Sequence, residues 1–236
     1  FTSLERGRPR AGPPKGQAGD VPRAPSRPIS QVSRTARAAV AGNGGRACVN
    51  ASAIWTPKGA DALALGLAKR LAGAKARSWD DPAAEVSAFA KPEVAEAINN
   101  MVEEGLKTPG ARDVTQEVRG TPRLVKDGRI AWLLPTVIRC DSPDHPLANK
   151  EFLFPYASVV EYPQYDVLKR IGYTLAATAL TDDPGFIAEC LACPHIERLN
   201  IGPLPTNRLT WDQPHEGNLF THLYKQRALQ HASAPG

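Results

Sequence analysis

The sequence has 236 residues, 42% of them hydrophobic, which is enough to bury a substantial core as one large domain or two small ones. The formal net charge of +5 alone suggests a nucleic-acid partner, but residues 1–40 hold eight Lys or Arg against two Asp or Glu. The rest of the chain therefore sums to −1, which excludes a basic nucleic-acid-binding surface spread over the whole protein.

The cysteine content and the hydropathy of the sequence bear on the cellular compartment of the protein. The chain has four cysteines, no signal-peptide pattern and no apolar run long enough to span a bilayer. These features predict a reducing, cytoplasmic setting.

Residues 1–35 form a segment rich in Arg, Pro, Gly, Ala and Ser, without hydrophobic periodicity. Such a segment cannot bury enough apolar surface to offset the entropy lost on ordering it, so we expect a disordered tail. A solvated tail is the favoured interpretation, and an arm that docks on nucleic acid or an acidic partner is the alternative. Interleaved aromatic residues that would stack on bases are lacking.

A glycine-rich, cationic turn precedes Cys48, and the alternating run over residues 51–56 predicts a strand directly after it. A thiol attacks a carbonyl as the thiolate, which nearby backbone N–H groups and cations stabilise. Gly44 and Gly45 allow close backbone approach, and Arg46 supplies charge. Cys48 is therefore a candidate nucleophile at a sheet edge, or else a small buried hydrophobe at a strand entry.

The next two segments have helical periodicity. Apolar residues recur at helical spacing over residues 61–71, and again over 82–106 with Lys91-Pro92 interrupting the middle. We expect both helices to cover a sheet.

From residue 114 the periodicity becomes that of strands. Asp127-Gly128 is a favoured two-residue hairpin turn between two alternating runs. The predicted strands cover residues 114–118, 122–126, 130–134 and 135–140.

Two residues in this region carry reactive side chains. Cys140 lies in a predicted strand and is expected to be structural, because by the family resemblance described below its position is that of a strand residue. His145 lies in the turn-rich loop 141–146, where solvent exposure is the favoured interpretation and a role as catalytic base the alternative, since no orienting partner is evident.

The C-terminal part has the strand-helix-strand rhythm of a parallel α/β domain. The nearly continuous apolar run over residues 173–180 predicts a strand buried on both faces. A last helix over 215–229 is expected to pack on the core or at a subunit interface. The elements before it are strands at 156–162, 173–180 and 196–201 and helices at 164–171 and 184–191.

Cys190 and Cys193 form a CxxC pair with His195 nearby. A structural zinc site usually has four ligands, and a second ligand pair is missing. A packed helix end is therefore favoured over a zinc site, and we predict no metal.

Two stretches resemble segments of the aldehyde dehydrogenase superfamily. Gly45-Arg46-Ala47-Cys48, followed by Asn50-Ala51-Ser52, is similar to the family's Gly-Gln-x-Cys with small residues and a strand after it. About a hundred residues later, Pro135-Thr136-Val137 and then Glu151-Phe152-Leu153-Phe154-Pro155 resemble its Pro-Thr-Val and Glu-x-Phe-Gly-Pro. The order and separation of these stretches match the family.

The resemblance implies a reaction and two site residues. Cys48 matches the nucleophile that attacks an aldehyde, after which hydride leaves to NAD or NADP and water cleaves the thioester. Glu151 matches the glutamate that holds the nicotinamide ribose. This sequence departs from the family at Leu153, where the family has an aromatic residue, and at Phe154, where it has glycine.

The resemblance also predicts an incomplete enzyme. Family members carry a dinucleotide-binding domain, an oxyanion-hole asparagine and a general-base glutamate before the cysteine, whereas this chain has the Arg/Pro-rich segment there. No Gly-x-Gly-x-x-Gly phosphate loop occurs. We therefore expect a truncated family member, inactive on its own, with homo-oligomerisation open.

The predicted fold is an α/β, aldehyde dehydrogenase-like catalytic domain over residues 36–236, with a mostly parallel sheet flanked by helices, after a disordered basic tail over residues 1–35. The predicted function is NAD(P)-dependent aldehyde oxidation through a cysteine thiohemiacetal and thioester. The alternative is a non-catalytic α/β scaffold or binding module with a basic partner-docking tail. A buried, unreactive Cys48 would favour that alternative.

Overall fold

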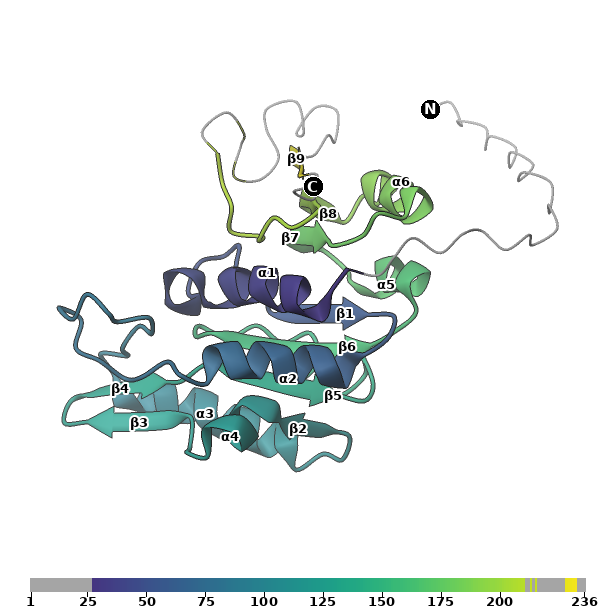
Figure 1. The fold of residues 1–236 in the computed structure, drawn as a ribbon. Coiled ribbons are helices and arrows are strands. Elements are labelled where there is room, and N and C mark those ends of the chain that lie inside the picture. Colours follow the sequence, from purple (N-terminus) through teal and green to yellow (C-terminus); the bar gives the residue numbers. More distant parts are fainter. Residues whose placement is uncertain (1–26, 211–212, 214, 216–227, 233–236) are drawn as a thin grey trace, which may run out of the picture.

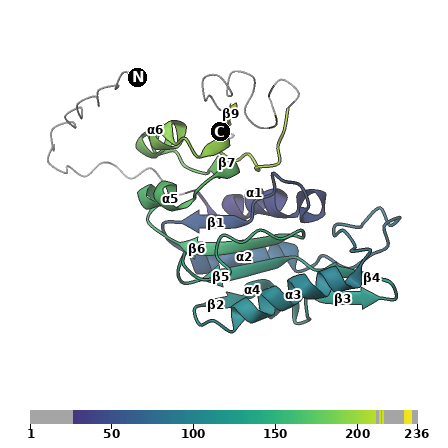
Figure 2. The ribbon, with the colours of Figure 1, turned by 180° about the vertical axis from the view of Figure 1, so that it is seen from behind.

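The computed structural model describes residues 27–210, 213, 215 and 228–232. Its main body is a four-stranded sheet in the order β1-β6-β5-β2, with helices on both faces (Figures 1 and 2). Strands β1 and β5 each run parallel to β6, and β2 is antiparallel to β5, so the mostly parallel sheet predicted from the sequence is confirmed. The strands are β1 Ala53–Thr56, β2 Ala111–Asp113, β5 Thr136–Cys140 and β6 Tyr156–Glu161.

The central strands are buried on both sides because successive side chains of a strand point to opposite faces. Val137 and Val159 pack in one core with α1 and α2, whereas Ile138 and Val160 pack in a second core with α3. This arrangement explains why β5 and β6 have nearly continuous apolar sequences. The helices are α1 Ile29–Ala41, α2 Ala60–Leu71 and α3 Pro92–Leu106.

The predicted hairpin is present beside α3. Strands β3 (Leu124–Asp127) and β4 (Ile130–Leu133) pair antiparallel as a separate two-stranded sheet. Gly128 has φ of 56° in the turn between them, a left-handed conformation that glycine adopts without a steric penalty.

A smaller parallel sheet lies over α1 and β1 in Figure 1 and has the order β7-β8-β9. The strand-helix-strand rhythm predicted for the C-terminal part is confirmed. However, β7 is half-buried along most of its length, not buried on both faces, because its residues line a cleft. These elements are α5 Gln164–Arg170, β7 Thr174–Ala179, α6 Pro184–Ala192, β8 Ile196–Ile201 and β9 Ala228–His231.

Two helix and strand predictions were wrong. Helix α3 begins at Pro92, so residues 82–91 are not helical and the proline starts the helix instead of interrupting it. Residues 114–118 lie in helix α4 (Val114–Arg119), not in a strand. The Asp113 carboxylate caps that helix by accepting from Gln116 N–H at 2.8 Å, and Gly120 ends it with φ of 73°.

The chain ends also differ from the prediction. Residues 29–35, assigned above to the disordered tail, form the first half of α1, whereas residues 1–26 lie outside the described part. Of the helix predicted over 215–229, residues 216–227 lie outside the described part, and the last two belong to β9. Within the residues that the structure describes, no helix is long and apolar enough to cross a membrane.

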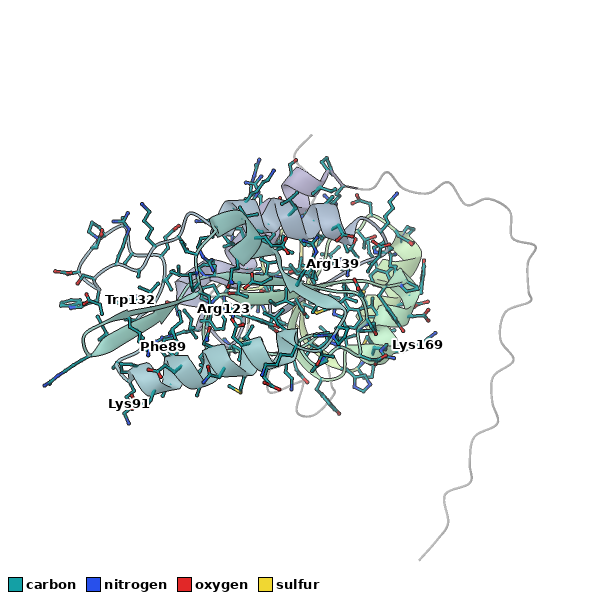
Figure 3. All side chains as sticks on the ribbon, turned by 90° about the horizontal axis from the view of Figure 1, so that it is seen from below. Phe89, Lys91, Arg123, Trp132, Arg139 and Lys169 are labelled. Atoms are coloured by element: carbon teal, nitrogen blue, oxygen red, sulfur yellow. The ribbon has the colours of Figure 1, made fainter. Side chains whose placement is uncertain are left out.

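A buried ion cluster joins the hairpin to the main sheet. The Arg123 side chain is fully buried and lies between the sheet and α3 (Figure 3). Its guanidinium contacts the Asp113 carboxylate at 2.6 Å and the half-exposed Glu103 carboxylate of α3, also at 2.6 Å. A buried charge needs such partners because its desolvation is costly.

Candidate functional site

The turn that carries Cys48 lies tightly against the loop that follows Glu151. The 3₁₀ turn η1 (Gly42–Gly45) links α1 to this segment. Gly45 has φ of 73°, and a Cβ atom there would lie 2.2 Å from the Pro155 backbone nitrogen. No residue with a side chain fits this approach. The same loop is also bound to strand β5, since Thr136 N–H donates to the Pro155 carbonyl oxygen at 2.9 Å.

The Asn50 side chain holds the cysteine turn in shape. Its Oδ1 accepts from Ala47 N–H at 2.7 Å, and its Nδ2 donates to the carbonyl oxygens of Ala39 and Gly42 at 2.7 and 3.0 Å. The amide therefore bridges both sides of Cys48 to the end of α1. Three of its hydrogen bonds are made within the turn, so it holds the backbone on both sides of Cys48, and it also lies on the cavity wall.

Arg46 fixes the neighbouring loop and is not directed at the thiol as the sequence suggested. Its guanidinium donates to the carbonyl oxygens of Leu153, Ser87 and Ala88 at 3.2, 3.3 and 2.9 Å. It also lies 4.2 Å from the centre of the Phe89 ring. Burial lowers the pKa of Arg46, although arginine stays protonated in proteins.

Cys48 and Glu151 line one cavity of about 160 Å³, although they are about a hundred residues apart in the sequence. Both side chains are exposed. The alternative that Cys48 is a small buried hydrophobe is therefore wrong. Both residues also lie on the wall of a larger cleft, of about 1380 Å³, lined by β1, β6 and β7.

The two departures from the family pattern lie beside this cavity and differ in burial. Leu153 is 59% exposed, whereas Phe154 is 2% exposed and packs against Phe152 and Tyr156. Phe154 thus fills the core behind the loop, and its backbone still lies against Gly45.

A histidine that the sequence analysis did not select lies against the cysteine. His215 Nε2 is 3.2 Å from Cys48 Sγ. His215 was predicted to begin the last helix, and nothing in its local sequence indicates a site. It reaches Cys48 only through tertiary packing, so no sequence signal could have found it.

His145 is buried, and the prediction that it faces solvent was wrong. Leu147 N–H donates to its Nδ1 at 3.1 Å, so Nε2 carries the proton and donates to the Thr108 carbonyl at 3.1 Å. Both nitrogens are used to hold the loop 141–146 against the end of α3. Cys140 is buried nearby, with Sγ 3.8 Å from Nδ1, and is structural as expected.

The CxxC pair packs inside the small sheet. Cys190 and Cys193 are buried in its apolar core at the end of α6, as the packed helix end requires. His195 packs edge to face with Tyr173, with ring centres 5.1 Å apart. Among the described residues, no group of three or more His, Cys, Asp or Glu side chains is arranged to hold a metal ion.

Comparisons with known proteins identify the fold. No protein-family model and no curated protein matches the sequence. Several solved structures match in three dimensions. A structure of 3,6-anhydro-L-galactose dehydrogenase in complex with NAP matches at TM-score 0.64 and 16% identity, covering 77% of this chain and 38% of that one.

Two further structures give the same result. One is a putative methylmalonate-semialdehyde dehydrogenase from Sinorhizobium meliloti complexed with NAD, with TM-score 0.63, 16% identity, and coverage of 75% of this chain and 37% of that one. The other is a mutant of an aldehyde dehydrogenase from Bacillus cereus, with TM-score 0.63, 18% identity, and coverage of 77% and 36%. The chain therefore has the fold of part of an aldehyde dehydrogenase, and it spans somewhat over a third of these proteins' length.

Proposed function

We propose that this chain carries the nucleophile-bearing part of an NAD(P)-dependent aldehyde-oxidising enzyme. The observation that carries the proposal is that Cys48 and Glu151 line a single cavity. A thiol and a carboxylate on one cavity wall supply two of the functions that this reaction needs. These functions are attack on the aldehyde carbon and orientation of the hydride acceptor.

In this proposal the Cys48 thiolate adds to the aldehyde carbonyl carbon, and the new carbon–sulfur bond gives a thiohemiacetal. Glu151 would hold the nicotinamide ribose, and the bound cofactor would supply the acceptor for the hydride that leaves this carbon. The Cys48 thioester that remains is cleaved by water to the carboxylic acid and the free thiol. Backbone N–H groups of the cysteine turn are the candidate donors to the oxyanion, since the Asn50 amide is engaged within the turn.

The cavity offers one contact for the proposed cofactor. Glu151 is exposed there, and its two carboxylate oxygens can accept hydrogen bonds from ribose hydroxyls. Phosphates would need cations or backbone N–H groups. Among the described residues that line the cavity, the cationic side chain is Arg46, and it already binds three carbonyl oxygens. We therefore propose that turnover requires a dinucleotide-binding part in addition to this chain's described residues.

The exposed thiol disfavours the alternative of a non-catalytic scaffold. That alternative predicts a buried and unreactive Cys48, whereas the side chain is exposed beside a histidine. The basic tail that would dock on a partner falls mainly in residues 1–26, outside the described part.

Protection of Cys48 by an aldehyde tests the proposal. The 236-residue chain is alkylated with iodoacetamide in the presence of increasing propanal, and each cysteine is followed by mass spectrometry. We expect propanal to slow alkylation of Cys48 with a saturable dependence, because the thiohemiacetal occupies the sulfur. Glutathione in the same tube reports the reaction of an ordinary thiol with the aldehyde, and propan-1-ol is the control ligand.

The outcomes separate two parts of the proposal. Protection of Cys48 no greater than that of glutathione, across short-chain and aromatic aldehydes, would show that no aldehyde site is formed. Steady production of NADH or NADPH by the chain alone would instead contradict the need for an additional dinucleotide-binding part. We expect saturable protection and no turnover.

A further inference from the structure

We infer that His215 is the proton acceptor for the Cys48 thiol, so that the two side chains form an activated nucleophile pair. This inference rests on the proposed function and adds a catalytic residue to it. The His215 Nε2 atom lies 3.2 Å from Cys48 Sγ, and both side chains are exposed. At that separation a proton passes from sulfur to nitrogen without an intervening water.

The proton transfer is balanced within the pair. The sulfur–hydrogen bond breaks, a nitrogen–hydrogen bond forms at Nε2, and the thiolate and imidazolium that result remain in contact. Opposite charges this close favour each other's charged forms. A thiolate can then attack a carbonyl carbon at neutral pH, where an ordinary cysteine is only a few per cent ionised.

The other charged groups of the cavity are poorer acceptors. Arg46 has no lone pair to accept a proton and is held by three backbone carbonyls. Glu151 lines the same cavity, but carboxylates of glutamate ordinarily have a pKa of about 4.3, compared with about 6.5 for histidine. The imidazole is therefore the stronger base beside the thiol.

The segment before His215 is built to dock on the cysteine turn. The Asn207 amide donates to the Ala38 carbonyl at 2.8 Å, which anchors this segment to the end of α1. A Cβ atom on Gly42 would lie 1.9 Å from Asn207 Nδ2. The glycine in the turn before Cys48 thus makes room for this anchor.

A second anchor lies two residues before the histidine. The buried Arg198 guanidinium on β8 donates to the Arg208 carbonyl and to Gln213 Oε1, both at 3.2 Å. Gln213 in turn donates through Nε2 to the Leu229 carbonyl of β9 at 3.2 Å. Two independent contacts therefore hold the segment whose next described residue is His215.

The test compares three versions of the full 236-residue chain: wild type, His215→Gln and His231→Gln. Glutamine keeps a hydrogen-bonding amide but cannot accept the proton. His231 is an exposed histidine on β9 and provides the matched control. The rate of iodoacetamide alkylation of Cys48 is measured at about pH 7 by mass spectrometry, together with the ultraviolet absorbance of the thiolate.

We expect His215→Gln to slow alkylation about threefold to fourfold, since the thiolate fraction falls to a few per cent while its intrinsic reactivity rises. Thiolate absorbance should fall by the amount expected for a single thiolate, and His231→Gln should match wild type. An equal alkylation rate of Cys48 and an equal thiolate absorbance in wild type and His215→Gln would show that His215 does not accept the Cys48 proton.

The two proposals fail separately. Saturable protection by propanal with no effect of His215→Gln would support the aldehyde site and show that His215 does not activate Cys48. A rate that depends on His215 without any protection by aldehydes would confirm the activated pair and overturn the proposed substrate class.

Discussion

Two cysteine–histidine pairs in this chain have similar chemistry and opposite environments. Cys48 and His215 are exposed beside a cavity, with Sγ and Nε2 3.2 Å apart. Cys140 and His145 are buried in the core, with 3.8 Å between Sγ and Nδ1. In the buried pair Nδ1 already accepts a backbone N–H and Nε2 donates to a carbonyl. The same two side-chain types therefore form a solvent-accessible contact in one place and a buried structural contact in the other, and only the first is suited to the proposed role of nucleophile and base.

The pKa of the buried Cys140 thiol shows how strongly its environment suppresses ionisation. Burial raises the pKa of the Cys140 thiol to about 12, with Asp141 adding to the rise and Arg139 opposing it. A thiol with this pKa is almost entirely protonated at any physiological pH.

The largest expected effect is therefore in relative alkylation at about pH 8. Cys140 should react with iodoacetamide at least about a hundredfold more slowly than Cys48, because about one Cys140 thiol in ten thousand is ionised. Mass spectrometry of tryptic peptides measures both rates in one sample. In concentrated urea the two rates should converge. Rates within about tenfold of each other in the folded protein would contradict the contrast.

The second prediction concerns the buried ion pair between Arg123 and Asp113, whose loss destabilises the core that also holds Cys140. Asp113→Ala leaves the Arg123 guanidinium buried without its closest enclosed partner, so the free energy of unfolding should fall by about 3–5 kcal/mol. Urea denaturation measures the loss, and Cys140 alkylation should accelerate in parallel.

The matched control is Glu103→Gln, which removes the half-exposed partner of the same arginine. We expect that variant to lose about 1 kcal/mol or less. Equal losses would show that burial is not the deciding factor.

The smallest expected effect is a pH dependence of the unfolding free energy that comes from the buried Cys140 thiol. The folded pKa of Cys140 is raised above its ordinary value of 9.0 to about 12, so the unfolded chain releases this proton first as the pH rises. Its contribution to stability is present below pH 9 and is lost between pH 9 and about 12. Within that window the unfolding free energy should fall by about 1.4 kcal/mol per pH unit more steeply in wild type than in Cys140→Ala.

Denaturation in urea at about pH 9.5 and about pH 10.5 measures this difference. Burial, with a smaller effect of Cys140, also raises the pKa of Tyr156, which adds to the alkaline loss in both proteins, so the difference between the two slopes is the quantity compared. Parallel slopes for wild type and Cys140→Ala would contradict the raised pKa.

The fold could be predicted where periodicity and turn chemistry agree. The hairpin at Asp127-Gly128 and the strands β5 and β6 follow from apolar alternation and a favoured turn. Residues 114–118 failed because Val114 and Val118 suit either a strand or one helical turn. The decisive signals were Asp113 before them and Gly120 after them, which are a helix cap and a helix stop.

The candidate site was predictable in part. The resemblance selected Cys48 and Glu151 from their order and spacing, and the structure places both on one cavity. The environments of Arg46 and His145 depend on which carbonyls tertiary packing brings near, and the sequence does not encode this locally. His215 depends on packing in the same way, since its approach to Cys48 requires the docking of the segment around Asn207.

The contact between Cys48 and His215 spans 167 positions of the chain. Closing a loop of this length costs conformational entropy, which must be offset by contacts formed elsewhere, so long-range pairs tend to form late in folding. Under the proposed pairing, an unfolded or half-folded chain exposes an ordinary thiol, and reactivity at neutral pH is acquired with the completed fold.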